Sequence, residues 1–182
     1  SLGTGIDPLD LIAGGPRPPV YREGGDFPAY GADAVRFGLL AMSSSQDVRF
    51  NEERVKQGRD LANKLWNAAR LILLRVSDVE PDPGAARELE DRWIVSRLER
   101  LTARATELYD GFRFSHAALD LYGAFWSELC DWYLELVKPR LYEEDNREVS
   151  GVLLWALERT LKLLHPVMPF VTEEIWSLMP GE

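Results

Sequence analysis

The chain has 182 residues, 46% of them hydrophobic, which is enough for one good-sized domain or for a domain with a small appendage. Its single cysteine, Cys130, excludes an internal disulfide, and the lack of a CxxC motif or a His/Cys cluster excludes a structural zinc site. No apolar run reaches about 18 residues and the first residues lack a signal-peptide pattern, so we expect a soluble, cytoplasmic chain that does not enter a membrane.

The first distinctive segment is the Gly/Pro-rich stretch at residues 13–29, which holds four glycines and four prolines. This composition supports neither a helix nor a central strand. Loops of this length are uncommon in compact domains. We therefore expect residues 13–29 to be a mobile loop that can be removed without loss of stability.

Three elements are predicted after this loop: a short helix at 33–41, a short extended segment at 46–50, and a long helix from about 51 to 76. Asn51 is a suitable N-cap for the long helix, and the acidic Glu52 and Glu53 are favourable in its first turn.

The rest of the chain predicts further helices at about 85–109, closed near Gly111; at about 115–137, capped by Ser115 and broken by Pro139; and at about 149–164. A short last piece is expected to be capped by Thr172. Short loops between long helices favour antiparallel neighbours. The predicted fold class is therefore all-α, an antiparallel helix bundle preceded by a small mixed segment.

The net charge of −9 argues, taken alone, against nucleic-acid binding, because phosphate contacts usually leave a basic surface. The distribution of charge argues the other way. Residues 49–75 contain only three acidic residues, Glu52, Glu53 and Asp60, against seven basic ones: Arg49, Arg54, Lys56, Arg59, Lys64, Arg70 and Arg75. A basic strip on an acidic body is therefore possible.

Two leucines fall on the polar sides of their predicted helices. At 100° per residue, Leu71 lies opposite the apolar arc of the long helix, which is expected to face the core and contains Val55, Leu61, Leu65, Trp66, Ala69, Ile72 and Val76. Leu134 likewise falls opposite a stripe that is expected to be buried: Leu119, Tyr122, Trp126, Leu129, Tyr133 and Leu136. Each leucine either packs against another part of the fold, which is common for single leucines, or contacts a ligand.

No group of residues predicts catalysis. The sequence has no Gly-rich phosphate loop and no GxSxG motif, and its only histidines are His116 and His165. His165 precedes a proline, which favours a packing or capping role. Asp131 and Glu135 lie one helical turn apart and could act as an acid–base pair, but such pairs are usually a solvated helix face.

Six motifs in order resemble one protein family. SLGTGIDPLDLI at 1–12 is similar to the segment directly after the KMSKS loop of class I aminoacyl-tRNA synthetases, with Ser1 at the last serine of that motif. YGADAVRF at 30–37, DVRF at 47–50 and NKLWNAAR at 63–70 continue the same family. CDWYLELVKPRLY at 130–142 resembles the valyl-tRNA synthetases in particular, and LLHPVMPFVTEEIW at 163–176 agrees.

This resemblance implies two parts. Residues 1–50 would be the stem-contact segment after the KMSKS loop, with 13–29 as an insertion, and residues 51–182 would be the class Ia anticodon-binding helical bundle, ending before a C-terminal coiled coil. The implied function is binding of tRNA(Val) and recognition of its anticodon. The residues that would contact the anticodon are Arg49, Glu53, Arg54, Lys64, Leu71 and Leu134. Arg49 and Lys64 would act on phosphates or base edges, and the two leucines on unstacked bases.

The resemblance also implies that the catalytic and editing parts precede Ser1. We therefore expect this fragment to be no enzyme and to hold no cofactor or metal, whereas the longer enzyme joins valine to tRNA(Val) with ATP. A monomer is expected. The alternatives are the same domain of an isoleucyl- or leucyl-tRNA synthetase, a helical protein-interaction scaffold, or a small stand-alone enzyme.

Overall fold

The structure of the chain is a computed structural model that describes residues 5–21, 25–42 and 50–180. Its first elements are the short helix α1 (Pro8–Ala13), the 3₁₀ turn η1 (Pro19–Tyr21), α2 (Ala32–Ala41) and the long helix α3 (Glu52–Leu73). The bundle continues with the turn η2 (Pro83–Ala85), α4 (Leu89–Asp110), α5 (Phe114–Gly123), the π-helix η3 (Ala124–Leu134), α6 (Glu135–Leu141), α7 (Arg147–Leu164) and α8 (Pro169–Trp176).

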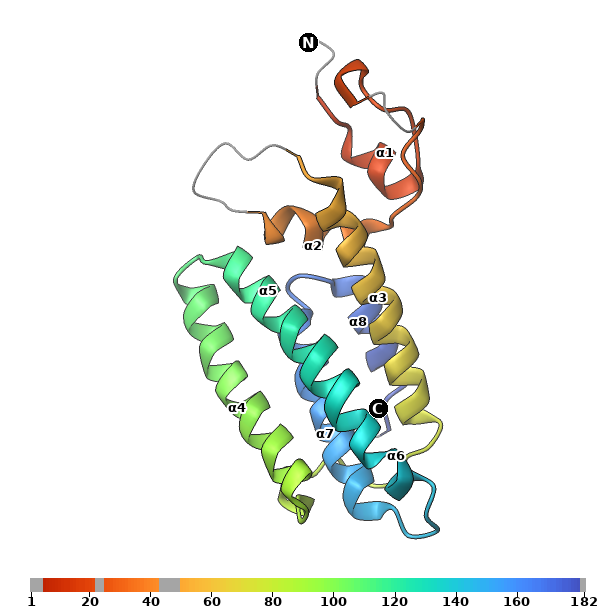
Figure 1. Cartoon of the computed structure of the whole chain (residues 1–182), viewed down its shortest axis with the longest axis vertical. Helices are drawn as coiled ribbons and strands as arrows, with labels where there is room; N and C mark the ends of the chain where they lie inside the picture. The colour runs from red at the N-terminus through yellow and green to blue at the C-terminus, as the bar shows by residue number, and fades with distance from the viewer. Residues whose placement is uncertain (1–4, 22–24, 43–49, 181–182) are drawn as a thin grey trace.

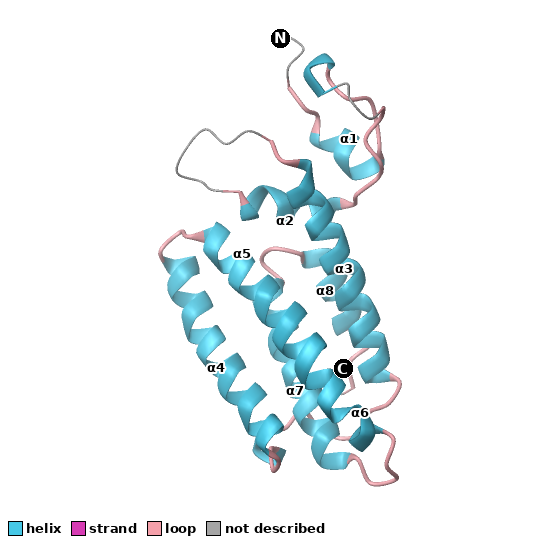
Figure 2. Cartoon of the chain, in the orientation of Figure 1, coloured by secondary structure: helices cyan, strands magenta, loops and turns pink. Residues whose placement is uncertain are grey.

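The long helices run side by side as an antiparallel bundle. Figure 1 shows α4, the continuous column α5–η3–α6, and α3 in one row, with α7 behind them and α1 beyond α2 and the start of α3. Within the described residues helices are the only regular elements (Figure 2), apart from an isolated antiparallel bridge between Gly15 and Phe27. The predicted all-α class is confirmed. Of the extended segment predicted at 46–50, only Phe50 lies within the described residues.

Helix α3 begins as predicted. The side chain of Asn51 accepts a hydrogen bond from the backbone N–H of Glu53, which satisfies a free amide of the first turn. The helix buries Leu61, Leu65 and Ile72 in the main core. Trp66, by contrast, is 38% exposed, so its predicted place on the core-facing side is wrong.

The middle column departs from the predicted spacing because residues 124–134 form a π-helix, in which hydrogen bonds close from i to i+5. Each π turn takes more residues than an α turn, so positions beyond it rotate away from a 100° projection. Leu134 is therefore only 4% exposed, whereas Leu136, predicted to be buried, is 53% exposed. The expected surface position of Leu134 is wrong.

Three predicted helix ends also differ. Helix α4 starts at Leu89, where Glu88 and Asp91 form a capping box, and the column continues past Pro139 to Leu141. Thr172 lies inside α8, and its hydroxyl donates to the carbonyl of Met168 instead of capping the helix.

The described part of residues 13–29 is packed, which contradicts the expectation of a loose loop. The backbone N–H groups of Gly15 and Phe27 each donate to the other residue's carbonyl, at N···O distances of 3.2 and 2.8 Å. Phe27 is 2% exposed and belongs to a small core with Leu11 and Val55. Burial of a whole phenyl ring stabilises a backbone that its Gly and Pro content alone would leave loose.

Helix α2 joins this small core to the main one. Its residues Ala34 and Val35 pack in the small core, and Phe37 and Ala41 pack in the main core. The proposed division at residue 50 therefore runs between two helices that are in close contact. Among the described residues, no helix is both long and apolar enough to cross a membrane.

Candidate nucleic-acid interface

Four of the six predicted contact residues, Glu53, Arg54, Lys64 and Leu71, lie on α3. They do not form one cluster, because Glu53 and Leu71 are separated by roughly 27 Å along the helix axis at about 1.5 Å per residue. Glu53 is exposed and pairs with Lys56 at 2.6 Å, and Arg54 donates to the side-chain oxygen of Gln57. Arg49 lies outside the described residues.

Lys64 is held by the neighbouring column. Its Nζ lies 2.6 Å from Oδ1 of Asp131 and 4.0 Å from the ring centroid of Trp126, both in η3. The Lys64–Asp131 pair stands on the solvent-exposed side of the α3–η3 junction, where salt screens such contacts. A phosphate would therefore compete with Asp131 for this ammonium group.

Three of the six described basic residues of the strip are neutralised by ion pairs, and two of the other three lie at the C-terminal end of α3 or just after it. Within it, Lys56, Arg59 and Lys64 each form an ion pair. Arg70 and Arg75 have exposed side chains and form no ion pair with a described carboxylate. Apart from Arg54, which bonds only the neutral side chain of Gln57, the positive charge without a carboxylate partner lies in the last turn of α3 and just after it.

The two leucines have separate positions. Leu71 is half-buried on α3, next to Arg70, and packs against the edge of the main core while part of its side chain meets solvent. Leu134 is enclosed in the main core and presents no apolar surface to a ligand. Of the pair, only Leu71 has apolar surface exposed to solvent.

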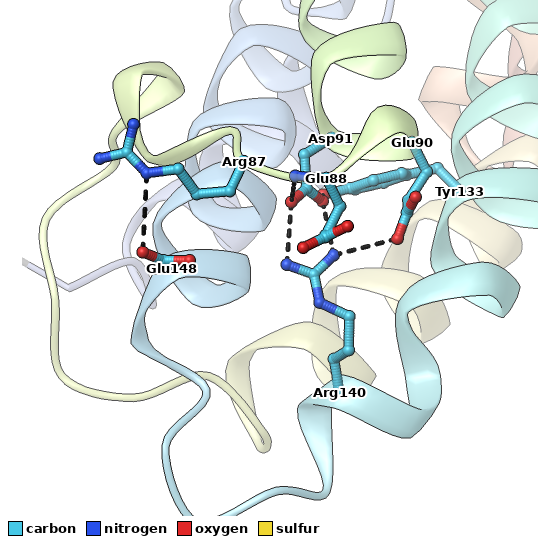
Figure 3. Close-up of polar contacts among 7 residues, drawn as sticks. All are labelled: Arg87, Glu88, Glu90, Asp91, Tyr133, Arg140 and Glu148. Carbon is cyan, nitrogen blue, oxygen red and sulfur yellow. Dashed lines mark hydrogen bonds and ion pairs between the residues drawn. The ribbon is translucent and has the colours of Figure 1, made fainter.

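A partly buried ion pair fixes the end of α6 against the start of α4. Figure 3 shows the guanidinium of Arg140 reaching from α6 to the carboxylates of Asp91 and Glu90. Asp91 is fully buried, accepts from Nη1 and Nη2 of Arg140 at 3.0 and 2.9 Å, and accepts from the hydroxyl of Tyr133 at 2.8 Å. Hydrogen bonding to Asp91 raises the pKa of Arg140, and burial raises the pKa of Tyr133. No local pattern in the sequence predicts this group, because the partners that bond each other lie 42 or more positions apart.

A second surface feature is an apolar groove of about 580 Å³ between α4 and the column. Its lining includes Leu89, Trp93, Trp132 and Leu136, with Arg97 and Glu128 at its polar edge. Arg97 and Glu128 form a bidentate salt bridge with N···O distances of 2.7 and 2.6 Å, so the charge at that edge is compensated.

The candidate catalytic groups have structural partners. Asp131 pairs with Lys64 and Glu135 pairs with Lys138, as expected for a solvated helix face. His165 ends α7, and its Nδ1 lies 2.9 Å from the hydroxyl of Thr172, in agreement with a packing or capping role.

Burial raises the pKa of the Cys130 thiol to about 12, so this thiol is unreactive in the folded chain. The described residues contain no group of three His, Cys, Asp or Glu side chains able to hold a metal ion.

The helical bundle has a family assignment. Residues 91–182 match the model of the family described as the anticodon-binding domain of tRNA ligase. The chain belongs to this family of anticodon-binding domains.

The relatives are more specific. The chain is 41% identical to the valine–tRNA ligase of Latilactobacillus sakei over 188 residues, which cover 99% of the chain and 20% of the relative. It is 42% identical to the enzyme of that name from Symbiobacterium thermophilum over 99% of the chain and 19% of the relative, and 40% identical to that of Enterococcus faecalis over 100% and 20%. The predicted resemblance to valyl-tRNA synthetases is confirmed, and the chain spans about a fifth of the length of these relatives.

Proposed function

We propose that this chain binds the anticodon arm of tRNA(Val) as part of a valine–tRNA ligase. The observation that carries the proposal is the C-terminal end of α3, where Arg70 and Arg75 lack carboxylate partners among the described residues and Leu71 is partly exposed between them. Anticodon loops are single-stranded, and their recognition needs cations for phosphates and apolar surfaces for unstacked bases. An anticodon-binding family and this arrangement support the same partner.

The predicted residues divide into direct and indirect roles in this proposal. Lys64 and Leu71 contact the loop directly, Lys64 after release from Asp131. Glu53 and Arg54, at the far end of α3, contact a more distant part of the arm, and Arg49 keeps the phosphate role that the resemblance implies. Leu134 supports the column from inside and has no contact with RNA.

The test is a titration of the chain with a tRNA(Val) anticodon stem-loop at several salt concentrations. Replacing Lys64 by Ala should weaken binding and reduce the salt slope by about one unit, because one phosphate contact is lost. Lys162→Ala is the matched control, since Lys162 also forms an ion pair, with Glu158, and also lies over a tryptophan ring, that of Trp176. Equal affinity and slope for both variants would place the interface elsewhere.

Leu71 should act without charge. Leu71→Asn should weaken binding by about 1 kcal/mol, at the lower end of the effect of a stacking surface, with an unchanged salt slope. Circular dichroism should confirm that this variant keeps its helix content. Stem-loops of tRNA(Ile) and tRNA(Leu) should bind more weakly than that of tRNA(Val); a preference for either would favour the corresponding synthetase.

The ATP-dependent joining of valine to tRNA(Val) belongs, in this proposal, to the longer ligase. The chain by itself is proposed to be a cytoplasmic monomer that binds RNA without cofactor or turnover. Valine-dependent pyrophosphate exchange by the purified chain would refute this part.

The apolar groove of Leu89, Trp93, Trp132 and Leu136 favours a second candidate function, a scaffold that docks a protein through this face. The salt titration separates the two functions. Strong salt dependence supports the RNA interface, and weak salt dependence with unchanged binding in Lys64→Ala supports the scaffold.

A further inference from the structure

An exposed aromatic ring with a cation over one face stands at the end of α6. Tyr142 follows Leu141 at the helix C-cap, and its side chain is 60% exposed. The guanidinium of Arg75, which follows α3, lies 4.6 Å from the centroid of the Tyr142 ring. Two chain segments far apart in the sequence thus present a planar ring and a planar cation together at the surface.

A buried side chain holds the backbone of Arg75 beside that of Leu141, the residue that precedes Tyr142. Asn146 donates from Nδ2 to the carbonyl of Arg75 at 3.1 Å and to the carbonyl of Leu141 at 3.0 Å. Its Oδ1 accepts from the hydroxyls of Ser77 and Ser150 at 2.5 and 2.9 Å. These four hydrogen bonds use both donors and both acceptor sites of the side-chain amide. Asn146 thus holds Arg75 directly and Tyr142 through the preceding residue, Leu141.

A second anchor lies just before Tyr142 in the chain. Arg140 is tied to Asp91 and Glu90 at the start of α4, as Figure 3 shows. The end of α6 is therefore held against α4 on one side and against the end of α3 on the other. A ring on such a backbone loses little conformational freedom on binding a ligand.

We infer that Tyr142 and Arg75 form a stacking site for one unpaired RNA base, a contact additional to Lys64 and Leu71. This inference rests on the proposed function. Aromatic rings and arginine planes are the surfaces on which unpaired bases stack. The acidic Glu143, Glu144 and Asp145, all exposed, follow Tyr142 directly.

These carboxylates decide which part of the RNA is bound. They repel phosphates, so the ring does not contact the sugar–phosphate backbone of the RNA. Carboxylates do accept hydrogen bonds from the amino groups of bases. The chemistry of the site therefore fits an uncharged base that carries an amino group. The phosphate contacts remain with Lys64 and the exposed Arg70 on α3.

The experiment uses the tRNA(Val) anticodon stem-loop with 2-aminopurine placed at one unpaired position at a time. Stacking on Tyr142 should quench the fluorescence at one position in the complex. Tyr142→Ala should restore that fluorescence and weaken binding about fivefold or more with an unchanged salt slope, whereas Tyr142→Phe should behave like the wild type. Arg75→Gln should weaken binding and lower the slope by at most about one unit.

The matched control is Phe112→Ala, which removes another exposed aromatic ring, in the turn after α4, and should leave binding unchanged. Tyr142→Ala that binds as tightly as the wild type, or quenching that this variant does not relieve at any position, overturns the stacking site while Lys64→Ala still tests the wider interface. A wild-type chain that binds no stem-loop overturns both proposals.

Discussion

At the scale of single residues, the Glu52 carboxylate fastens the N-terminal segment to α3. Arg17 donates to it from Nη1 and Nη2 at 2.5 and 2.8 Å, and the Tyr30 hydroxyl donates at 2.5 Å. Hydrogen bonding from Arg17 lowers the pKa of Glu52, while burial raises the pKa of Tyr30 to about 12. The folded state therefore favours ionised Glu52 and neutral Tyr30.

The signs of these two shifts predict a stability window. Because the pKa of Glu52 is lowered on folding, its contribution is complete above about pH 4.3, the ordinary Glu pKa, and is lost as the pH falls through the folded value. Glu52→Gln should lower the melting temperature at pH 7 by about 2–4 °C, equivalent to about 1 kcal/mol for a partly exposed pair. The difference from the wild type should shrink below about pH 4. A difference that is constant from pH 3 to pH 7 would contradict the role of this carboxylate.

How far single residues could be predicted depended on the distance to their partners. The N-cap role of Asn51 follows from neighbouring residues and was predicted, and Leu71 lies on the less buried side of α3 as expected. The pairing of Lys64 with Asp131 joins positions 67 residues apart, so no local sequence pattern predicts it. For the same reason Tyr142, whose partner is Arg75, was not singled out.

At the scale of elements, α2 and α3 cross closely because glycines stand at their contact. A Cβ added at Gly58 would lie 2.7 Å from the carbonyl oxygen and 2.9 Å from the Cα of Ala34, and both of these atoms belong to backbone that cannot rotate away. One added at Gly38 would lie 2.9 Å from the Cα of Val55. The two helices can approach this closely only without side chains at these positions.

Gly58→Ala should therefore destabilise the chain by about 1–3 kcal/mol, because the overpacked contact outweighs the better helix propensity of alanine. Gly123→Ala is the matched control. Gly123 is also helical, but an added Cβ meets nothing within 4 Å, so this variant should be as stable as the wild type or more stable by up to about 1 kcal/mol. Urea unfolding of the three proteins measures both effects, and equal stability of the two variants would exclude the proposed close contact.

Helices with α periodicity were predicted to within a few residues, as for α2 and α7. The π-helix η3 was not predicted, because its sequence does not differ from that of an apolar α-helix, and one wrong period misplaced both Leu134 and Leu136. The prediction of a loose loop for the Gly/Pro-rich stretch was also wrong. Its composition indicates only that the backbone forms no helix or strand, whereas its packing comes from Phe27 and Arg17, whose partners lie elsewhere in the chain.

At the scale of the whole molecule, α2 makes the two cores interdependent. Val35 is buried in the small core and Phe37 in the main core, only two positions apart on one short helix. The helix cannot leave one core and keep its packing in the other. We therefore expect both cores to unfold in a single cooperative transition.

Cys130 provides the test, because it lies in the main core, is 6% exposed, and belongs to a different core from Phe27. Its thiol should react with iodoacetamide only when the bundle opens, at a rate that follows the open population when opening and closing are fast. Phe27→Ala removes a buried ring and should cost about 3 kcal/mol, which would raise the alkylation rate of Cys130 about a hundredfold if both cores open together. Phe170→Ala, which removes an exposed ring, is the control and should leave the rate unchanged. Should Phe27→Ala lower the melting temperature of the N-terminal segment alone and leave Cys130 as protected as in the wild type, the two cores would be independent folding units, and residue 50 would mark a physical boundary.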